Sequence, residues 1–253
     1  MTRIITCTSG KGGAGKTTLV ANLGLALREF GRDVIVVDGN LTTPNLGIHL
    51  GVPLYPTTLH DVLKGKAHIK DAIYHHETGL KIIPAGISLR DLRGVDAHEL
   101  PNALLDLLGS AEIILIDSAA GLGREALAAI EASDEIIIVT NPDLPSVTDA
   151  LKTLKLAEQM GTRILGVVLN RVTKREHEMT TEQIRDMLDT EILAEIPEDI
   201  NVHKSVSSKR PVVHHVPHAV ASHEIRKLAA RLVGAEYRVR TPWFKRLLSF
   251  MFR

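Results

Sequence analysis

The chain has little cysteine, few aromatic residues and no excess of either charge. Cys7 is the single cysteine among 253 residues, which excludes a disulfide framework and any cluster bound by several cysteines of one chain. Lys and Arg together number 30, and Asp and Glu also number 30. A nucleic-acid-binding protein usually carries a basic excess or a basic stripe, so specific nucleic-acid binding is not expected.

Long apolar runs are also missing. No stretch approaches the roughly 20 apolar residues of a membrane-spanning helix, and the N-terminus lacks the charged, apolar and cleavage regions of a signal peptide. Hydrophobic residues make up 44% of the chain, enough for a sizeable core near the upper size of a single domain. We therefore expect a soluble, cytoplasmic protein built mainly from one domain.

Short apolar runs alternate with longer amphipathic segments. The runs are continuous and rich in Ile and Val, which is typical of strands buried on both faces of a parallel sheet. The predicted strands cover residues 4–8, 34–37, 80–83, 113–116, 136–140, 164–169 and 192–195. The predicted helices cover 16–30, 101–108, 124–132, 145–160, 180–188 and 217–233, with a loop and one short helix over 197–216. This alternation predicts an α/β fold with a doubly wound, mostly parallel sheet.

A glycine-rich motif lies between the first predicted strand and the first predicted helix. Residues 10–17 read GKGGAGKT and match the phosphate-binding pattern G-x4-G-K-[ST]. Glycines let backbone N–H groups surround phosphates. The Lys16 side chain would reach the β- and γ-phosphates, and Lys11 places a second cation next to them. The predicted ATP-binding residues of this loop are Gly10, Lys11, Gly12, Gly13, Ala14, Gly15, Lys16, Thr17 and Thr18. The motif predicts a P-loop ATPase.

Two aspartates, Asp38 and Asp117, follow predicted strands directly. Ligands of parallel α/β sheets bind beyond the carboxyl ends of the strands, so both carboxylates should lie near the phosphate loop. With the Thr17 hydroxyl they form a predicted Mg²⁺ site. The alternative is that each aspartate is only a helix cap or turn residue.

Several segments resemble the MinD/ParA family of ATPases. Residues 11–18 are similar to its deviant Walker A motif, 36–40 (VVDGN) to its first switch, and 116–122 (IDSAAGL) to its Walker B motif and second switch. Residues 140–142 (TNP), 166–171 (GVVLNR) and 196–199 (IPED) also fit MinD, and archaeal members are the most similar. The resemblance covers essentially the whole chain and implies a P-loop ATPase of this type, with ATP or ADP and Mg²⁺ as ligands.

The resemblance also implies roles for individual residues. Lys11 would be the signature lysine that crosses the interface of an ATP-sandwiched homodimer, and Asp149 would hold it when ATP is absent. Catalytic roles fall on Lys11, Lys16, Asp38 and Asn40. The predicted adenine site consists of Asn170, Arg171, Pro197, Glu198 and Asp199.

Asn40 departs from the family pattern. Many members carry a second aspartate at this position, which is thought to orient the attacking water. The Asn40 carbonyl oxygen can hold a water, but the side chain cannot take a proton or supply negative charge. We therefore expect hydrolysis that is slow without a protein activator. The alternative is that Asn40 is simply a turn residue.

The C-terminal tail concentrates the scarce aromatic residues. Residues 241–253 read TPWFKRLLSFMFR and contain three of the four Phe and the single Trp. At about 100° per residue the apolar side chains fill one continuous arc. Such a helix, about 20 Å long, would lie in the membrane interface rather than cross it. The predicted membrane-binding residues are Trp243, Phe244, Lys245, Arg246, Leu247, Leu248, Phe250, Met251 and Phe252. The alternative is a terminal helix packed on the protein's own core.

Together these features predict an ATPase domain over residues 1–236 and a linker with a membrane-targeting tail over 237–253. ATP would drive homodimerisation, and the dimer would bind an anionic surface on the inner face of the cell membrane. There it would position division or other cellular machinery through an unidentified partner protein. Two alternatives share the fold: a ParA-type DNA-segregation ATPase, which needs a basic surface, and a slowly hydrolysing, nucleotide-locked membrane scaffold.

Overall fold

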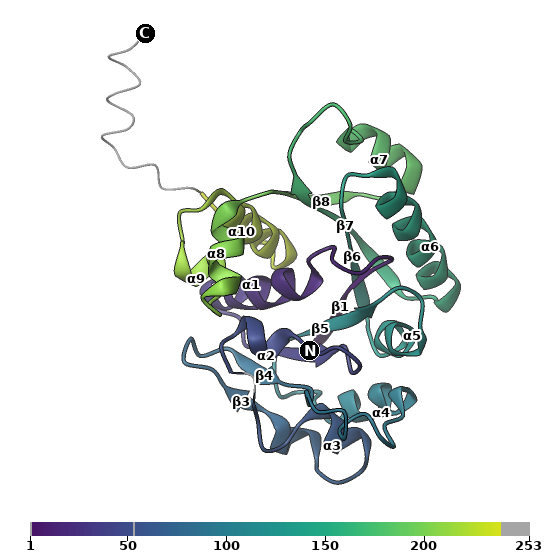
Figure 1. The fold of residues 1–253 in the computed structure, drawn as a ribbon, viewed down its shortest axis with the longest axis vertical. Helices are drawn as coiled ribbons and strands as arrows, with labels where there is room; N and C mark the ends of the chain where they lie inside the picture. Colours follow the sequence, from purple (N-terminus) through teal and green to yellow (C-terminus); the bar gives the residue numbers. More distant parts are fainter. Residues whose placement is uncertain (1, 53, 239–253) are drawn as a thin grey trace.

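A central eight-stranded sheet with helices on both faces forms the molecule (Figure 1). The computed structural model describes residues 2–52 and 54–238. The strand order is β3-β4-β2-β5-β1-β6-β7-β8, and all neighbours are parallel except the antiparallel pair β3 and β4. The strands are β1 Arg3–Ser9, β2 Val34–Gly39, β3 Tyr74–His75, β4 Lys81–Ile83, β5 Ile113–Ala120, β6 Glu135–Thr140, β7 Arg163–Val172 and β8 Ile192–Pro197. The predicted doubly wound, mostly parallel fold is confirmed.

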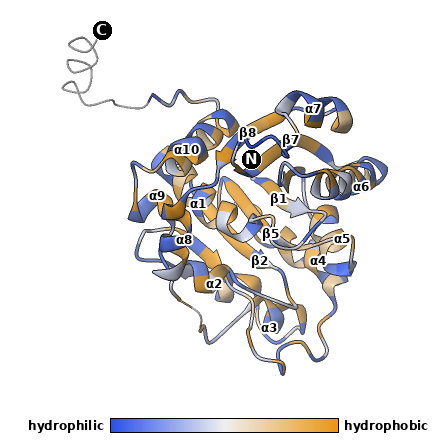
Figure 2. Cartoon of the chain, turned by 45° about the horizontal axis from the view of Figure 1, so that its top comes forward, coloured by the Kyte–Doolittle hydropathy of each residue, from blue (hydrophilic) through white to orange (hydrophobic). Residues whose placement is uncertain are grey.

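The helices divide between the two faces of the sheet. Helices α1, α9 and α10 pack on one face with α2 at its edge, and α3 to α7 cover the other face. The helices are α1 Lys16–Glu29, α2 Leu46–His49, α3 Leu59–Leu63, α4 Leu100–Leu105, α5 Arg124–Glu131, α6 Leu144–Met160, α7 Thr181–Leu188, α8 Ile200–Ser207, α9 Val212–His215 and α10 Val220–Leu232. Two short 3₁₀ helices are η1 Ile69–Ala72 and η2 Ala97–Glu99. Figure 2 shows hydrophobic residues concentrated in the strands and on the inward sides of these helices.

Successive residues of the central strands enter different cores. Ile5 packs into the core beneath α1 and α10, whereas Ile4 packs into the core beneath α3, α4 and α5. Strand β2 divides in the same way, with Val36 in the first core and Val37 in the second. Because side chains alternate across a strand, a strand covered on both faces needs an apolar residue at every position.

The structure departs from the sequence-based expectations in three regions. Strand β3 was not predicted, because its two residues form no apolar run. Segment 44–72, for which no helix or strand was predicted, contains α2, α3 and η1. Segment 197–216 contains two helices, α8 and α9, rather than one. All of these helices except α8 have only 4 or 5 residues, too few for a hydrophobic period to be recognised.

The predicted membrane-binding residues 243–252 lie outside the described residues, as do 239–242 and 253. Within the described part of the chain, no helix is both long and apolar enough to cross a bilayer.

Candidate functional site

The phosphate loop joins β1 to α1 at the middle of the sheet. Strand β1 has β5 on one side and β6 on the other, which creates the crevice where ligands of open α/β sheets bind. Gly13 and Gly15 have φ angles of +82° and +95°, in the left-handed region that favours glycine. A Cβ on Gly10 would lie 2.3 Å from the backbone oxygen of Asp149 on α6. Backbone conformation or close approach therefore requires glycine at these three positions.

The Lys16 side chain is buried at the base of this loop. Its Nζ donates a hydrogen bond to Ser9 Oγ at 2.8 Å, and Ser9 Oγ donates to the Lys11 carbonyl oxygen at 2.8 Å. Burial lowers the pKa of Lys16, and the Asp117 carboxylate opposes this effect. A desolvated cation gains most from an anionic partner, so the loop is suited to a phosphate group.

Asp38 and Asp117 lie side by side in the sheet. They are paired residues of the neighbouring strands β2 and β5, and both are buried. Asp38 accepts hydrogen bonds from the backbone N–H groups of Leu46 at 3.0 Å and Asn40 at 3.3 Å. Both carboxylate oxygens of Asp117 are buried without a well-formed hydrogen bond. A buried carboxylate normally accepts hydrogen bonds. The two oxygens of Asp117 are instead available to bind a cation.

The electrostatics of the two aspartates agree with this geometry. Burial, and then the Asp117 carboxylate, raise the pKa of Asp38, while backbone hydrogen bonds oppose the rise. Burial raises the pKa of Asp117 to about 6, opposed by the Thr17 hydroxyl and the Lys16 ammonium group. Two neighbouring carboxylates and a hydroxyl suit Mg²⁺, which takes few protein ligands and keeps water and phosphate oxygens. Thr17, Asp38 and Asp117 can therefore hold this ion.

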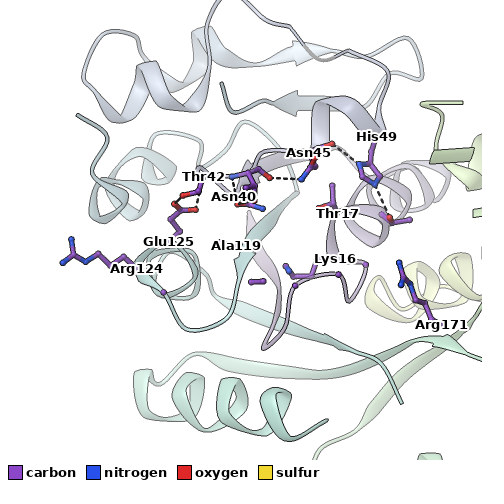
Figure 3. A pocket seen from close by; sticks show the side chains of 17 residues that line it. Lys16, Thr17, Asn40, Thr42, Asn45, His49, Ala119, Arg124, Glu125 and Arg171 are labelled. Atoms are coloured by element: carbon purple, nitrogen blue, oxygen red, sulfur yellow. Dashed lines mark hydrogen bonds between the residues drawn. The ribbon is translucent and has the colours of Figure 1, made fainter. Parts of the chain in front are cut away.

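Two adjoining cavities open above the loop. The larger, about 620 Å³, is shown in Figure 3 and is bordered by the phosphate loop, residues 40–45 and the start of α5. The smaller, about 290 Å³, lies between the phosphate loop, α8 and the end of β8. Both are lined by Gly15, Thr18, His49 and Arg171. The cavities therefore meet along one side of the phosphate loop.

The residues predicted to hold adenine line the smaller cavity together: Asn170, Arg171, Pro197, Glu198 and Asp199. Asn170 Nδ2 donates to the Ala14 carbonyl oxygen at 2.7 Å, which joins the end of β7 to the phosphate loop. Arg171 has a positive φ of 58°, and its Nε lies 3.9 Å from Glu198 Oε2.

Asn40 lines the larger cavity but already has partners. Its side-chain oxygen accepts from the Thr43 backbone N–H at 3.2 Å and from the Thr43 hydroxyl at 3.1 Å. This is the turn geometry required by the alternative interpretation of Asn40. The same two hydrogen bonds occupy the oxygen that was predicted to hold a water.

The side chain of Lys11 is exposed, unlike that of Lys16. Asp149, suggested by the resemblance as its partner, instead accepts a hydrogen bond from Lys152 Nζ at 3.0 Å. Asp149 nevertheless lies beside the loop, because its backbone contacts Gly10.

Sequence reasoning missed His49, which lines both cavities. Its Nδ1 lies 3.0 Å from the Asn45 carbonyl oxygen, and its Nε2 lies 3.2 Å from Thr18 Oγ1. A carbonyl oxygen only accepts, so Nδ1 carries the proton and Nε2 accepts from the Thr18 hydroxyl. No signal distinguished His49 in a chain with 12 histidines.

Known proteins with a nucleotide-binding domain are similar to this chain. Residues 5–212 match the model of the CobQ/CobB/MinD/ParA nucleotide binding domain. The chain belongs to this family. It is 41% identical to an uncharacterized ATP-binding protein of Methanocaldococcus jannaschii, over 92% of this chain and 88% of that protein. It is 32% identical to the septum site-determining protein MinD of Thermotoga maritima, over 84% of this chain and 81% of that protein.

Solved structures of the family have the same fold. The septum site-determining protein MinD of Pyrococcus horikoshii, complexed with Mg-ADP, gives a TM-score of 0.89 at 40% identity, with 92% of this chain and 96% of that one covered. The cell division ATPase MinD of Pyrococcus furiosus gives 0.90 at 37% identity, with 92% and 99% covered. The predicted MinD/ParA resemblance is therefore confirmed.

Proposed function

We propose that this chain is a MinD-type ATPase that binds ATP with Mg²⁺ and hydrolyses it to ADP and phosphate. The observation that carries the proposal is the buried Lys16 under a glycine loop, next to the paired carboxylates of Asp38 and Asp117. The Mg-ADP complex of the Pyrococcus horikoshii relative and the ATP-binding Methanocaldococcus relative support it.

The two cavities suggest how the nucleotide lies. The phosphates would occupy the larger cavity, where Lys16 and the loop N–H groups from Gly10 to Thr18 bind them. Adenine would enter the smaller cavity beside Asn170, Arg171 and the backbone of residues 197–199. Thr17, Asp38 and Asp117 would hold Mg²⁺, which neutralises charge on the phosphates during transfer.

Turnover is expected to be slow without an activator. Catalysis of phosphoryl transfer depends mainly on positioning and electrostatic stabilisation, and Asn40 supplies no negative charge to orient the water. Asn40→Asp should therefore raise the rate of phosphate release. An unchanged rate in this variant would show that residue 40 is only part of the turn.

ATP would also assemble a membrane-binding homodimer. The exposed Lys11 is available to reach across to a partner's phosphates. The tail has three cations among its last nine residues, each contributing about 1 kcal/mol near anionic lipid, so one tail should bind weakly. Two tails on one dimer gain from effective concentration, and hydrolysis would then release the protein from the inner face of the cell membrane.

The proposed cellular role is to position division or other machinery. Septum site-determining relatives support this role, as does an Aquifex aeolicus relative, 31% identical, that was solved as a MinC:MinD cell division complex. The cargo or activator of this chain would be a protein that recognises the ATP-bound dimer.

Two alternatives have distinct tests. A ParA-type DNA-segregation ATPase would bind DNA through a basic surface, which the balanced charge of this chain does not favour. A nucleotide-locked scaffold would stay on lipid without turnover, and phosphate release measured with vesicles distinguishes it from an ATPase.

The deciding experiment is co-sedimentation with anionic vesicles in ATP and in ADP, comparing the full chain with one ending at Arg240. Binding by the full chain alone, mainly with ATP, would support the membrane switch. Two variants provide a matched pair: Phe250→Asp places a charge in the apolar arc, and Ser249→Asp places the same charge outside it. Only Phe250→Asp should abolish binding. Equal binding by the full and shortened chains would refute the role of the tail.

A further inference from the structure

The larger cavity contains a carboxylate that the phosphate-binding motif does not include. Glu125, half-buried near the start of α5, lines this cavity together with Asn40 and Thr42 (Figure 3). Among the described residues that line the cavity, Glu125 is the one carboxylate. Asp38 and Asp117 are buried within β2 and β5, with 1% and 0% of their surfaces exposed. Glu125 is therefore the carboxylate that can contact a water molecule in this cavity.

Glu125 is held against the loop that contains Asn40. The Thr42 backbone N–H donates to Glu125 Oε2 at 3.2 Å, and the Thr42 hydroxyl donates to Oε1. Thr43, the next residue, provides both hydrogen bonds to Asn40. The first turn of α5 also favours a negative charge, because the helix N-terminus is positive. Position 40 lacks a carboxylate, and α5 brings one to the same loop.

We propose that Glu125 orients the attacking water in place of an aspartate at position 40; this rests on the proposed ATPase function. The water oxygen bonds to the γ-phosphorus, and the bond from that phosphorus to the bridging oxygen breaks, so that ADP leaves with the electron pair. Glu125 accepts a hydrogen bond from the water, whose proton passes to the released phosphate. Thr42 is a positioning residue, because it holds the carboxylate at the edge of the cavity.

Glu125→Gln tests the charge while keeping the size of the side chain. Its amide oxygen can still accept from one of the two Thr42 donors, and direct ATP binding shows whether the loss of the other contact disturbs the site. We expect kcat for ATP to fall roughly 10- to 100-fold, with the Kd for ATP, measured by direct binding, within about twofold of the unaltered chain. Glu131→Gln is the matched control, because Glu131 is an exposed residue at the end of the same helix.

A double substitution distinguishes a catalytic role of Glu125 from a purely structural one. Asn40→Asp should raise kcat by a larger factor in a Glu125→Ala background than in the unaltered chain, because the two carboxylates replace each other. Equal factors in both backgrounds, or normal kcat in Glu125→Gln, would overturn the role of Glu125. Failure of the unaltered chain to bind ATP would instead refute the proposed function itself.

Discussion

Asp38 on β2 and Asp117 on β5 are paired residues of neighbouring parallel strands, and both carboxylates are buried. Each aspartate destabilises the charged form of the other, because like charges repel strongly where water is excluded. A divalent cation removes this repulsion. Metal binding should therefore contribute to the stability of the folded chain as well as to nucleotide binding.

Removing one of these charges should separate the two effects. Asp117→Asn relieves the repulsion but also removes the carboxylate that favours the charged form of Lys16, so thermal unfolding in EDTA should shift upward by no more than about 2–4 °C, equivalent to about 1 kcal/mol. Mg²⁺ should no longer strengthen ATP binding in this variant, as measured by titration calorimetry with and without the ion. Asp186→Asn, on the exposed side of α7, should behave like the unaltered chain. A Mg²⁺ effect that survives Asp117→Asn would remove Asp117 from the metal site.

Two glycines with similar backbone angles should respond differently to alanine. Gly15 has φ +95°, and a Cβ there would lie 2.2 Å from Asn170 Nδ2, whereas Gly31 has φ +77° and open space around it. Both substitutions should cost about 1–2 kcal/mol of unfolding free energy, because L-residues disfavour this conformation. Only Gly15→Ala should weaken nucleotide binding, by roughly 100-fold or more. Similar affinities in the two variants would argue against the phosphate loop as the binding site.

Asn170 offers a test of base recognition. Its amide donates to Ala14 at 2.7 Å, so Asn170→Ala removes one hydrogen bond to the phosphate loop as well as the proposed contact with adenine. We expect ATP affinity to fall roughly tenfold, as for the loss of about 1.4 kcal/mol. Affinity for GTP, measured in parallel, should fall less than affinity for ATP if the Asn170 side chain contacts adenine specifically. Equal losses for both nucleotides would assign Asn170 to the loop alone.

The buried His60 should make stability depend on pH. Gly86 N–H donates to its Nδ1 at 2.9 Å, so Nε2 carries the proton and donates to the Leu41 carbonyl oxygen at 3.1 Å. Burial is the main cause that lowers the pKa of His60, so the unfolded chain takes up the proton first. The stability from this residue is therefore complete above about pH 6.5 and is lost as pH falls through the lower folded pKa.

Denaturant titrations between pH 5 and pH 7 test this prediction for His60. His60→Leu should unfold more easily at pH 7, by about 2 kcal/mol, because it leaves a buried N–H and a buried C=O unpaired. It should also lose part of the pH dependence of the unfolding free energy. His98→Gln, at an exposed position, should keep that dependence in full. Parallel pH profiles for His60→Leu and the unaltered chain would contradict the prediction.

Much of the fold follows from local features of the sequence. Runs such as 113–116 are apolar at every position, and a strand covered on both faces requires this composition. The phosphate loop is a continuous segment whose glycines and lysines carry the signal without any distant contact. Both predictions depend on neighbouring residues, which is why the sheet and the position of the loop could be predicted from the sequence alone.

Other features depended on contacts between distant residues, and only the tertiary structure decided them. The pairing of Asp38 with Asp117 requires β5 to lie next to β2. The order of strands in a sheet cannot be predicted from the residues of any single strand. The contact of Asn170 with Ala14 joins residues 156 positions apart, and that of Glu125 with Thr42 joins residues 83 apart. A single polar side chain is not part of a periodic sequence pattern, so its role cannot be predicted in that way. The sequence by itself therefore determined where the phosphates could bind, and the packing of α5, β5 and β7 around the loop decided which side chains meet there.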